Sequence, residues 1–209
     1  PIAHRLTEAL EKAREHEIVD LCSGGGGPWL RLLPKLGDRR PARVLLTDKH
    51  PNALGAHRVA EVSDGRIRSE PRSVDATAVP RDLRGFRTMF TSFHHFHPAA
   101  ARAILADAVD NRVGIGIFEF TERTVWAVAV LALTPFAVLL GVPFLRPIRW
   151  QTFVLTYLIP ALPLGVLFDG IVSCLRTYSP AELSELVEPL RGAGYAWEIG
   201  QVRNWRTKI

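Results

Sequence analysis

Cysteine is scarce in this 209-residue sequence, and long runs of basic residues are absent. Two cysteines, Cys22 and Cys174, are too few for a disulfide framework, so we expect a reducing, cytoplasmic environment. The formal charge of +5 permits contact with nucleic acid or anionic lipid, but without a basic run it requires neither. Residues 1–17 carry many charges and predict a helix rather than the apolar core of a secretion signal.

Patterns typical of strands and of helices alternate along the chain. Short apolar runs predict strands, and longer segments with helical spacing or a proline near their start predict helices. The predicted strands are 17–24, 42–50, 67–76, 86–96, 113–120 and 195–203, and the predicted helices are 3–16, 28–37, 51–62, 97–111 and 179–194. This order predicts an α/β fold with a Rossmann-like, doubly wound and mostly parallel sheet in one domain, 1–209.

Four consecutive glycines follow the first predicted strand, and Asp20 lies just before them. Glycine loses more backbone entropy on folding than any other residue, so the run indicates that something approaches the backbone closely. A glycine loop between a strand and a helix lets a ligand lie against bare backbone, as dinucleotides and S-adenosylmethionine do. The dinucleotide fingerprint G-x-G-x-x-G/A ends on Trp29 or Leu30 in its two registers, so it is not met.

The stretch from Asp20 to Gly26 resembles motif I of the class I S-adenosylmethionine-dependent methyltransferases, an acid followed by three alternate glycines. Cys22 stands at the first glycine position here, which is a departure from the motif. The resemblance implies that Asp20 helps to hold the loop and the amino end of the cofactor. It also implies that the loop passes under the methionine part of the cofactor, with Cys22, Ser23, Gly24, Gly25 and Gly26 as the binding residues.

Three further elements follow in the order of that family. Asp48 ends the second predicted strand, where a carboxylate suits two ribose hydroxyls, and the adjacent Lys49 either flanks the ribose or is solvated. Asp75 and Ala76 follow the third strand, where the family's acid meets the adenine amino group. Ser92 ends the fourth strand, in a stretch that resembles motif IV and borders cofactor and substrate. The resemblance implies S-adenosyl-L-methionine as the cofactor, and no metal ion is expected.

The histidines of "FHHFH" are the candidates for a general base. Imidazole titrates near neutrality, so His94 or His95 would suit removal of a proton from a hydroxyl nucleophile. The alternative is structural, because successive residues at a strand end alternate faces and one histidine would cap the following helix or pack on a neighbour. The Asn/Asp-Pro-Pro-aromatic motif of adenine N6 enzymes is absent at 92–95, and no aromatic stacking platform is evident, so a nucleic-acid acceptor is not expected.

Residues 124–145 contain no charged residue, and after Arg146 and Arg149 a second uncharged stretch extends to Phe168. As a helix the first stretch would extend about 33 Å, enough for a bilayer core. Four prolines and the arginines in the connecting loop argue against two straight spanning helices. Three interpretations stay open: a lid over an apolar substrate, contact with the inner face of the membrane, or a homo-oligomer interface. We expect an apolar helical insertion at 124–168 that combines lid and membrane contact.

Four polar residues flank this block and are candidates for orienting the substrate: Glu119, Asp169, Arg176 and Tyr178. A structural role is the alternative for two of them, with Asp169 capping a helix and Arg176 pairing with an acid. The family closes its sheet with a seventh strand, and residues 204–209 would either begin that strand or leave the edge open.

The combined prediction is a methyltransferase that transfers a methyl group from S-adenosylmethionine to a small apolar or lipid-like acceptor. Two other functions remain as alternatives: a noncatalytic, membrane-associated scaffold that keeps the fold, and an NAD(P)-dependent oxidoreductase. The oxidoreductase is disfavoured because no Tyr-x-x-x-Lys pair is present. The scaffold is disfavoured because it has no need of the bare glycines together with Asp48 and Asp75.

Overall fold

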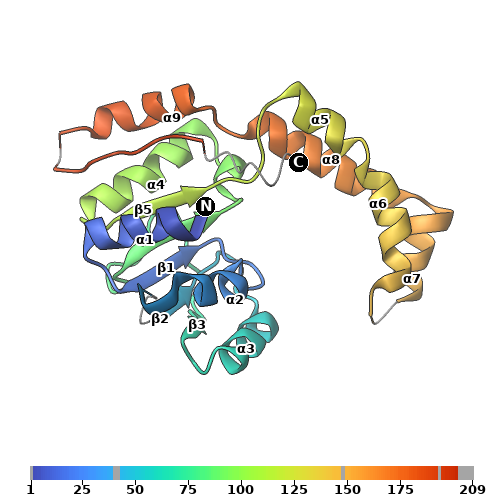
Figure 1. Cartoon of the computed structure of the whole chain (residues 1–209), viewed down its shortest axis with the longest axis horizontal. Helices are drawn as coiled ribbons and strands as arrows, with labels where there is room; N and C mark the ends of the chain where they lie inside the picture. The colour runs from blue at the N-terminus through green and yellow to red at the C-terminus, as the bar shows by residue number, and fades with distance from the viewer. Residues whose placement is uncertain (1, 40–42, 147–148, 193, 202–209) are drawn as a thin grey trace. The chain divides into compact units, whose positions relative to one another are not determined.

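The computed structural model describes residues 2–39, 43–146, 149–192 and 194–201. These residues fall into two compact units, one formed by 2–120 with 180–201 and the other by 121–179. The apolar insertion expected at 124–168 lies within the second unit. Both units appear in Figure 1, and each is described separately below.

The first unit is built around a five-stranded sheet in which every neighbouring pair is parallel (Figure 1). Its strands lie in the order β3-β2-β1-β4-β5. The order reverses between β1 and β4, and open α/β sheets bind ligands beyond the carboxyl ends of the strands at such a point. The bounds are β1 Glu17–Leu21, β2 Arg43–Leu46, β3 Ile67–Ser69, β4 Phe86–Phe90 and β5 Ile115–Phe118. The predicted Rossmann-like fold is confirmed.

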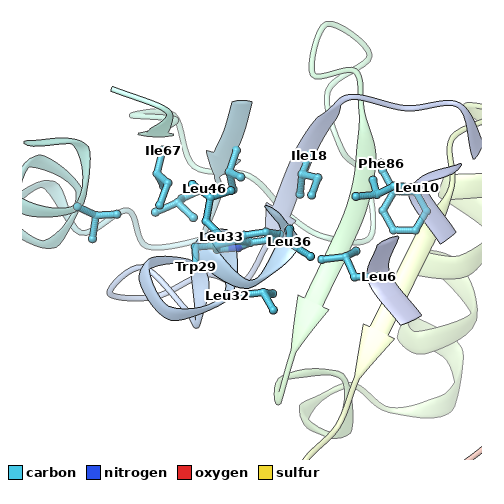
Figure 2. Close-up of a cluster of buried hydrophobic side chains, with 12 residues drawn as sticks. Leu6, Leu10, Ile18, Trp29, Leu32, Leu33, Leu36, Leu46, Ile67 and Phe86 are labelled. Carbon is cyan, nitrogen blue, oxygen red and sulfur yellow. The ribbon is translucent and has the colours of Figure 1, made fainter. Parts of the chain in front are cut away.

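Helices cover both faces of the sheet, because successive side chains of β4 contact different helices. Phe86 belongs to a buried apolar cluster with residues of α1 and α2, whereas the next residue, Arg87, pairs with Asp107 of α4. Side chains alternate across a strand, so these helices pack on opposite faces. Figure 2 shows the cluster, in which Leu6, Leu10, Trp29, Leu32 and Leu33 meet Ile18, Leu46, Ile67 and Phe86. The helices of this unit are α1 Ile2–Ala13, α2 Trp29–Leu32, α3 Ala53–Val62, α4 Pro98–Asp110 and α9 Pro180–Val187.

Several predicted elements differ from the structure in extent. The strand predicted at 67–76 comprises only Ile67–Ser69. The helix predicted at 28–37 is a single turn, α2, followed by the 3-10 segment Leu33–Arg39, which contains Pro34. The strand predicted at 86–96 ends at Phe90, and Phe93–His95 form a 3-10 turn.

The sixth strand predicted at 195–203 is wrong for the part that the structure describes, since residues 195–201 form no strand. Side chains hold this segment instead: the Tyr195 hydroxyl donates to the Val113 carbonyl, and Glu198 pairs with Arg5 and Lys12 of α1. The possible seventh strand at 204–209 lies outside the described residues.

The second unit is entirely helical within its described residues. Its first limb is α5 Val125–Leu131 and α6 Thr134–Gly141, continued by the 3-10 turn Val142–Phe144. Its second limb is α7 Trp150–Phe153 with the π-helical turn Val154–Leu158, then α8 Ala161–Arg176. Both α5 and α6 pack against α8. The prolines lie in first turns or at a cap, where no backbone N–H is needed from them.

The buried Arg87–Asp107 ion pair generates a stability prediction. Arg87 is almost fully buried, and its guanidinium lies 2.5 Å from Asp107 Oδ2. The substitution Asp107→Asn leaves a buried cation without its counter-charge, which we expect to lower the free energy of unfolding by about 2–4 kcal/mol. Urea denaturation followed by tryptophan fluorescence measures the change. The matched control is Asp110→Asn, an exposed acid three residues further along α4, which we expect to change stability by less than about 0.5 kcal/mol.

Candidate functional site

The glycine loop begins at the carboxyl end of β1, where Ser23 ties it to the neighbouring strand. The buried Ser23 hydroxyl lies 2.7 Å from the Asp20 carbonyl and 3.0 Å from the Thr47 carbonyl, and it accepts the Thr47 N–H at 3.0 Å. Cys22 adopts φ +57°, in the left-handed region that favours glycine. A residue other than glycine adopts this conformation at a cost of about 1–2 kcal/mol, which Cys22 bears here.

The four glycines serve two different purposes. A side chain at Gly26 would place Cβ 2.8 Å from Val59 Cγ2, which the packing does not allow without a shift. Gly27 adopts φ +56°, which strains a larger residue, and its Cβ would lie 3.3 Å from Asp20 Oδ2. A Cβ at Gly24 or Gly25 would meet no atom within 4 Å. Gly25 also lacks a positive φ, so neither packing nor conformation explains it. Open space over these two exposed glycines is what close approach of a ligand to the backbone needs.

Asp48 holds the loop from the end of β2. Its Oδ2 accepts the Gly24 N–H at 2.8 Å, and its Oδ1 accepts the His50 N–H at 2.8 Å. The half-buried carboxylate therefore fixes two segments of backbone at once. Each oxygen keeps a second lone pair, so Asp48 can still accept hydrogen bonds from a ligand.

Asp75 follows β3 and is held by Thr77 and Lys49. Its Oδ1 accepts the Thr77 hydroxyl at 2.7 Å and the Thr77 N–H at 2.9 Å, and its Oδ2 lies 2.9 Å from Lys49 Nζ. The Thr77 hydroxyl, then the Thr77 N–H and then Lys49 lower the pKa of Asp75 to about 2. Lys49 is thus an exposed ion-pair partner of Asp75, and the adjacent Ala76 is buried.

Asp20 is almost completely buried, beneath the loop that it precedes. Its Oδ1 accepts the Thr88 hydroxyl from β4 at 2.6 Å, and its Oδ2 faces Gly27. Burial raises the pKa of Asp20 to about 7, against the opposing effect of polar groups on Thr88, Trp29 and Ser23. The expected role of Asp20 in holding the loop and the amino end of a cofactor stays a prediction.

Three carboxylates act together on this edge of the sheet. The pKa of the Cys22 thiol rises to about 12, first because of burial and then because of the negative charges of Asp48, Asp20 and Asp75. The helix that follows the loop is a single turn, so it supplies little of the helix dipole that attracts phosphate. Lys49 offsets the charge of Asp75, and Asp20 with a pKa of about 7 is only partly ionised near neutral pH, so the edge keeps a smaller net negative charge. That charge favours a cationic ligand over a pyrophosphate.

The buried His94 and the half-buried Glu119 form a pair beyond the ends of β4 and β5. His94 Nδ1 lies 2.8 Å from Glu119 Oε2, and Glu119 Oε1 accepts the backbone N–H groups of Phe93 at 2.7 Å and His94 at 3.3 Å. Among the described residues, His94 Nε2 and the buried Ser92 hydroxyl have no hydrogen-bond partner. His95 is exposed, with its ring centroid 4.2 Å from that of His94.

The pairing of His94 with Glu119 was missed from the sequence, which treated Glu119 as a substrate contact. The feature of the sequence that could have revealed the pairing is that both residues follow predicted strands that lie next to each other in the sheet. The other substrate candidates, Asp169, Arg176 and Tyr178, belong to the second unit. Asp169 lies exposed within α8 rather than at a cap, and Arg176 is the exposed last residue of α8. Their proposed contacts with substrate stay predictions.

A hollow of about 310 Å³ opens at the opposite edge of the sheet, at the amino ends of the strands. Its charged lining residues are Glu17, Arg43, Arg68, Asp82 and Arg84. Parallel sheets bind ligands beyond their carboxyl ends, so this hollow is not the candidate site.

No model of a known family matches the sequence, and no curated protein matches it significantly. Solved structures do resemble it. An O-methyltransferase from neocarzinostatin biosynthesis, in complex with S-adenosylmethionine and 2-hydroxy-5-methyl naphthoic acid, has 19% identity and a TM-score of 0.48, covering 92% of this chain and 50% of that one. An S-adenosylmethionine-dependent methyltransferase from Aquifex aeolicus has 14% identity and a TM-score of 0.42, covering 90% and 78%. PKMT2 from Rickettsia typhi, in complex with AdoHcy, has 10% identity and a TM-score of 0.43, and the match covers 88% of this chain and 38% of that one. The chain thus spans half the length of the neocarzinostatin protein.

The raised pKa of Asp20 predicts a pH dependence of stability. An unfolded aspartate titrates near 3.8 and folded Asp20 near 7, so between these values the folded chain holds a proton that the unfolded chain has released. Stability therefore falls as pH rises from about 4 to about 7 and then levels off. In Asp20→Asn the side chain at position 20 no longer titrates. The free energy of unfolding of this variant, relative to that of the wild type, should therefore rise through this window by up to about 1.4 kcal/mol per pH unit.

Urea denaturation of both proteins at pH 4.5, 5.5, 6.5 and 7.5 measures this difference. Asp110→Asn, which removes an exposed carboxylate, is the control and should keep a constant offset from the wild type. An equally constant offset for Asp20→Asn would contradict the assignment of a proton to buried Asp20.

Proposed function

We propose that this chain is an S-adenosylmethionine-dependent methyltransferase. The observation that carries the proposal is the bare backbone at Gly24 and Gly25, held by Asp48 and set among three carboxylates at the carboxyl edge of the sheet. A ligand here needs a flat region that contacts backbone, hydroxyl groups for a carboxylate, and positive charge. A nucleoside that carries a sulfonium and an ammonium group satisfies all three requirements.

The residues that would hold this cofactor follow from the geometry. Gly24 and Gly25 offer backbone without side chains, and Asp48 offers the remaining lone pairs of a carboxylate that is already fixed in place. Asp75 keeps its negative charge over the whole physiological range because its pKa is about 2. The cofactor supplies an electrophilic methyl group on a positively charged sulfur. The negative surroundings of Cys22 suit that charge and oppose the pyrophosphate of NAD.

His94 is the proposed general base, which makes an oxygen acceptor the best match. Glu119 at 2.8 Å from Nδ1 favours the tautomer with hydrogen on Nδ1, which leaves the Nε2 lone pair available. This nitrogen is buried and unpartnered among the described residues, so a hydroxyl proton on the acceptor would satisfy it. After proton transfer, the Glu119 carboxylate would stabilise the imidazolium.

We propose a small apolar or lipid-like molecule as the acceptor. The nearly uncharged stretches of the second unit support an apolar partner for this chain more than a nucleic acid. For nucleic acid, a phosphate backbone would have to lie beside the carboxylates of Asp48 and Asp75.

Cofactor binding should depend strongly on Asp48. The substitution Asp48→Asn removes one negative charge, and its amide nitrogen cannot accept the N–H of Gly24 or of His50. We expect the dissociation constant for S-adenosylmethionine, measured by isothermal titration calorimetry, to rise at least tenfold, or about 1.4 kcal/mol. Asp110→Asn, the same change at an exposed acid on α4, should bind as the wild type does. Equal affinity of both variants would exclude Asp48 from the site.

Turnover should depend on His94 without a matching effect on cofactor affinity. With phenols and aromatic carboxylic acids as acceptors, including 2-hydroxy-5-methyl naphthoic acid, release of S-adenosylhomocysteine reports methyl transfer. We expect His94→Gln to lower kcat about 100-fold or more and Glu119→Gln to lower it about tenfold, since general-base catalysis contributes about 10²–10⁴-fold. The control is His97→Gln, an exposed histidine three residues away. Unchanged kcat in His94→Gln would refute the role of this base.

A further inference from the structure

The helical second unit, residues 121–179, presents an apolar surface of unusual extent. In its first limb, Val125–Phe144 has a mean hydropathy of 2.4 and only 6% of it is buried. The large side chains Trp126, Phe136, Leu140 and Phe144 are 63–84% exposed. A core helix of a soluble protein with this composition would be mostly buried, so the exposed surface needs an apolar partner.

The outward face of the second limb is apolar as well. Phe153, Leu158, Leu164 and Phe168 are each at least 57% exposed. The two limbs pack on each other through α5, α6 and α8, so their exposed surfaces are turned away from that contact. A second copy docked on one limb would leave the other limb in water, whereas a hydrocarbon phase would cover both.

Three hydroxyl groups in the limbs donate to backbone carbonyls of the same unit. Thr134 donates to the Leu131 carbonyl at 2.7 Å, Thr156 to the Thr152 carbonyl at 2.6 Å, and Tyr157 to the Leu139 carbonyl at 2.5 Å. A polar group without a partner costs several kcal/mol in hydrocarbon, because no water is present to replace the partner. Because these three hydroxyl groups already have partners, they would not be left unpaired when the limbs enter a lipid phase.

Apart from Asp169, an exposed acid seven residues before the end of α8, the charged residues of the limbs lie at their ends, close to aromatic residues. The first limb has 20 residues, or about 30 Å, the thickness of a bilayer core. Arg123 precedes it and Arg146 follows it, while Arg149 begins the second limb and Arg176 ends it. Trp126 and Trp150, each 72% exposed, lie within three residues of these arginines. Tryptophan and arginine at the ends of an apolar helix are typical of the interface between hydrocarbon and lipid headgroups.

We propose that residues 121–179 insert into a lipid bilayer, with the apolar limbs in the hydrocarbon and the arginines among anionic headgroups. The second limb is bent by 76° between Trp150–Leu158 and Ala161–Arg176, so its two segments take different directions within the membrane. This proposal rests on the second unit alone and does not depend on methyl transfer.

Vesicle flotation tests the proposal. The full chain is purified in mild detergent and mixed, as detergent is removed, with vesicles of phosphatidylcholine alone or with 30% phosphatidylglycerol, then floated on a density gradient. The test variant is Phe136→Glu with Leu140→Glu, two exposed residues one turn apart. The matched control is Ile2→Glu with Val62→Glu, which adds the same charge at exposed apolar positions of the first unit. A third variant, Arg146→Gln with Arg149→Gln, tests the headgroup contacts, and circular dichroism checks that every variant is folded.

We expect the wild type and the control to float with both vesicles, and the Phe136/Leu140 variant to lose at least 100-fold in partition coefficient, since carboxylates are costly in hydrocarbon. The arginine variant should weaken binding about fivefold per arginine on anionic vesicles and hardly at all on phosphatidylcholine. Three results would overturn the proposal: no flotation of the wild type, equal flotation of the wild type and the Phe136/Leu140 variant, or a defined soluble oligomer in place of flotation. The last result would assign the apolar surface to contact between copies of the chain.

Discussion

The carboxylate of Asp48 is the constraint on which the candidate site depends. It accepts the N–H of Gly24 with one oxygen and the N–H of His50 with the other, so the ends of β1 and β2 share one anchor. Ser23 makes a second connection between the ends of β1 and β2, through hydrogen bonds of its hydroxyl group to the backbone of Thr47. Ordering a loop of four glycines costs backbone entropy, which these hydrogen bonds help to offset. The absence of side chains at Gly24 and Gly25 leaves the outer surface of the loop open for a ligand.

The acids of this edge explain which ligand the loop suits. Asp75 is ionised down to about pH 2, Asp20 is buried with a pKa of about 7, and both act with Asp48 on the Cys22 thiol. A phosphate-binding loop needs the opposite, a positive helix end, and α2 is a single turn. The same glycine-rich connection can thus serve a dinucleotide or a sulfonium cofactor, and the surrounding charge decides between them.

The sequence predicted the parallel sheet and the glycine loop because apolar runs, prolines and glycines report local backbone preferences. It also placed Asp48 at the end of the second strand, whereas Asp75 lies six residues beyond the end of β3. It missed the pairing of His94 with Glu119, since residues 25 positions apart meet only through the order of β4 and β5. It predicted the fourth strand six residues too long, because Phe93–His95 form a 3-10 turn whose N–H groups donate to Glu119, a contact that the local sequence does not reveal. The strand predicted at 195–203 failed for a similar reason: tertiary contacts of Tyr195 and Glu198 hold residues 195–201 in place of a strand ladder.

The most direct test of the central claim is calorimetric titration of the folded full chain with S-adenosylmethionine, S-adenosylhomocysteine and NAD under identical conditions. A site of bare glycines among three carboxylates predicts micromolar binding of the two adenosyl amino acids, more than 100-fold tighter than any binding of NAD. Binding of NAD at comparable affinity would contradict the account and favour an oxidoreductase. Failure of a protein shown to be folded to bind any of the three ligands would contradict it and favour a scaffold.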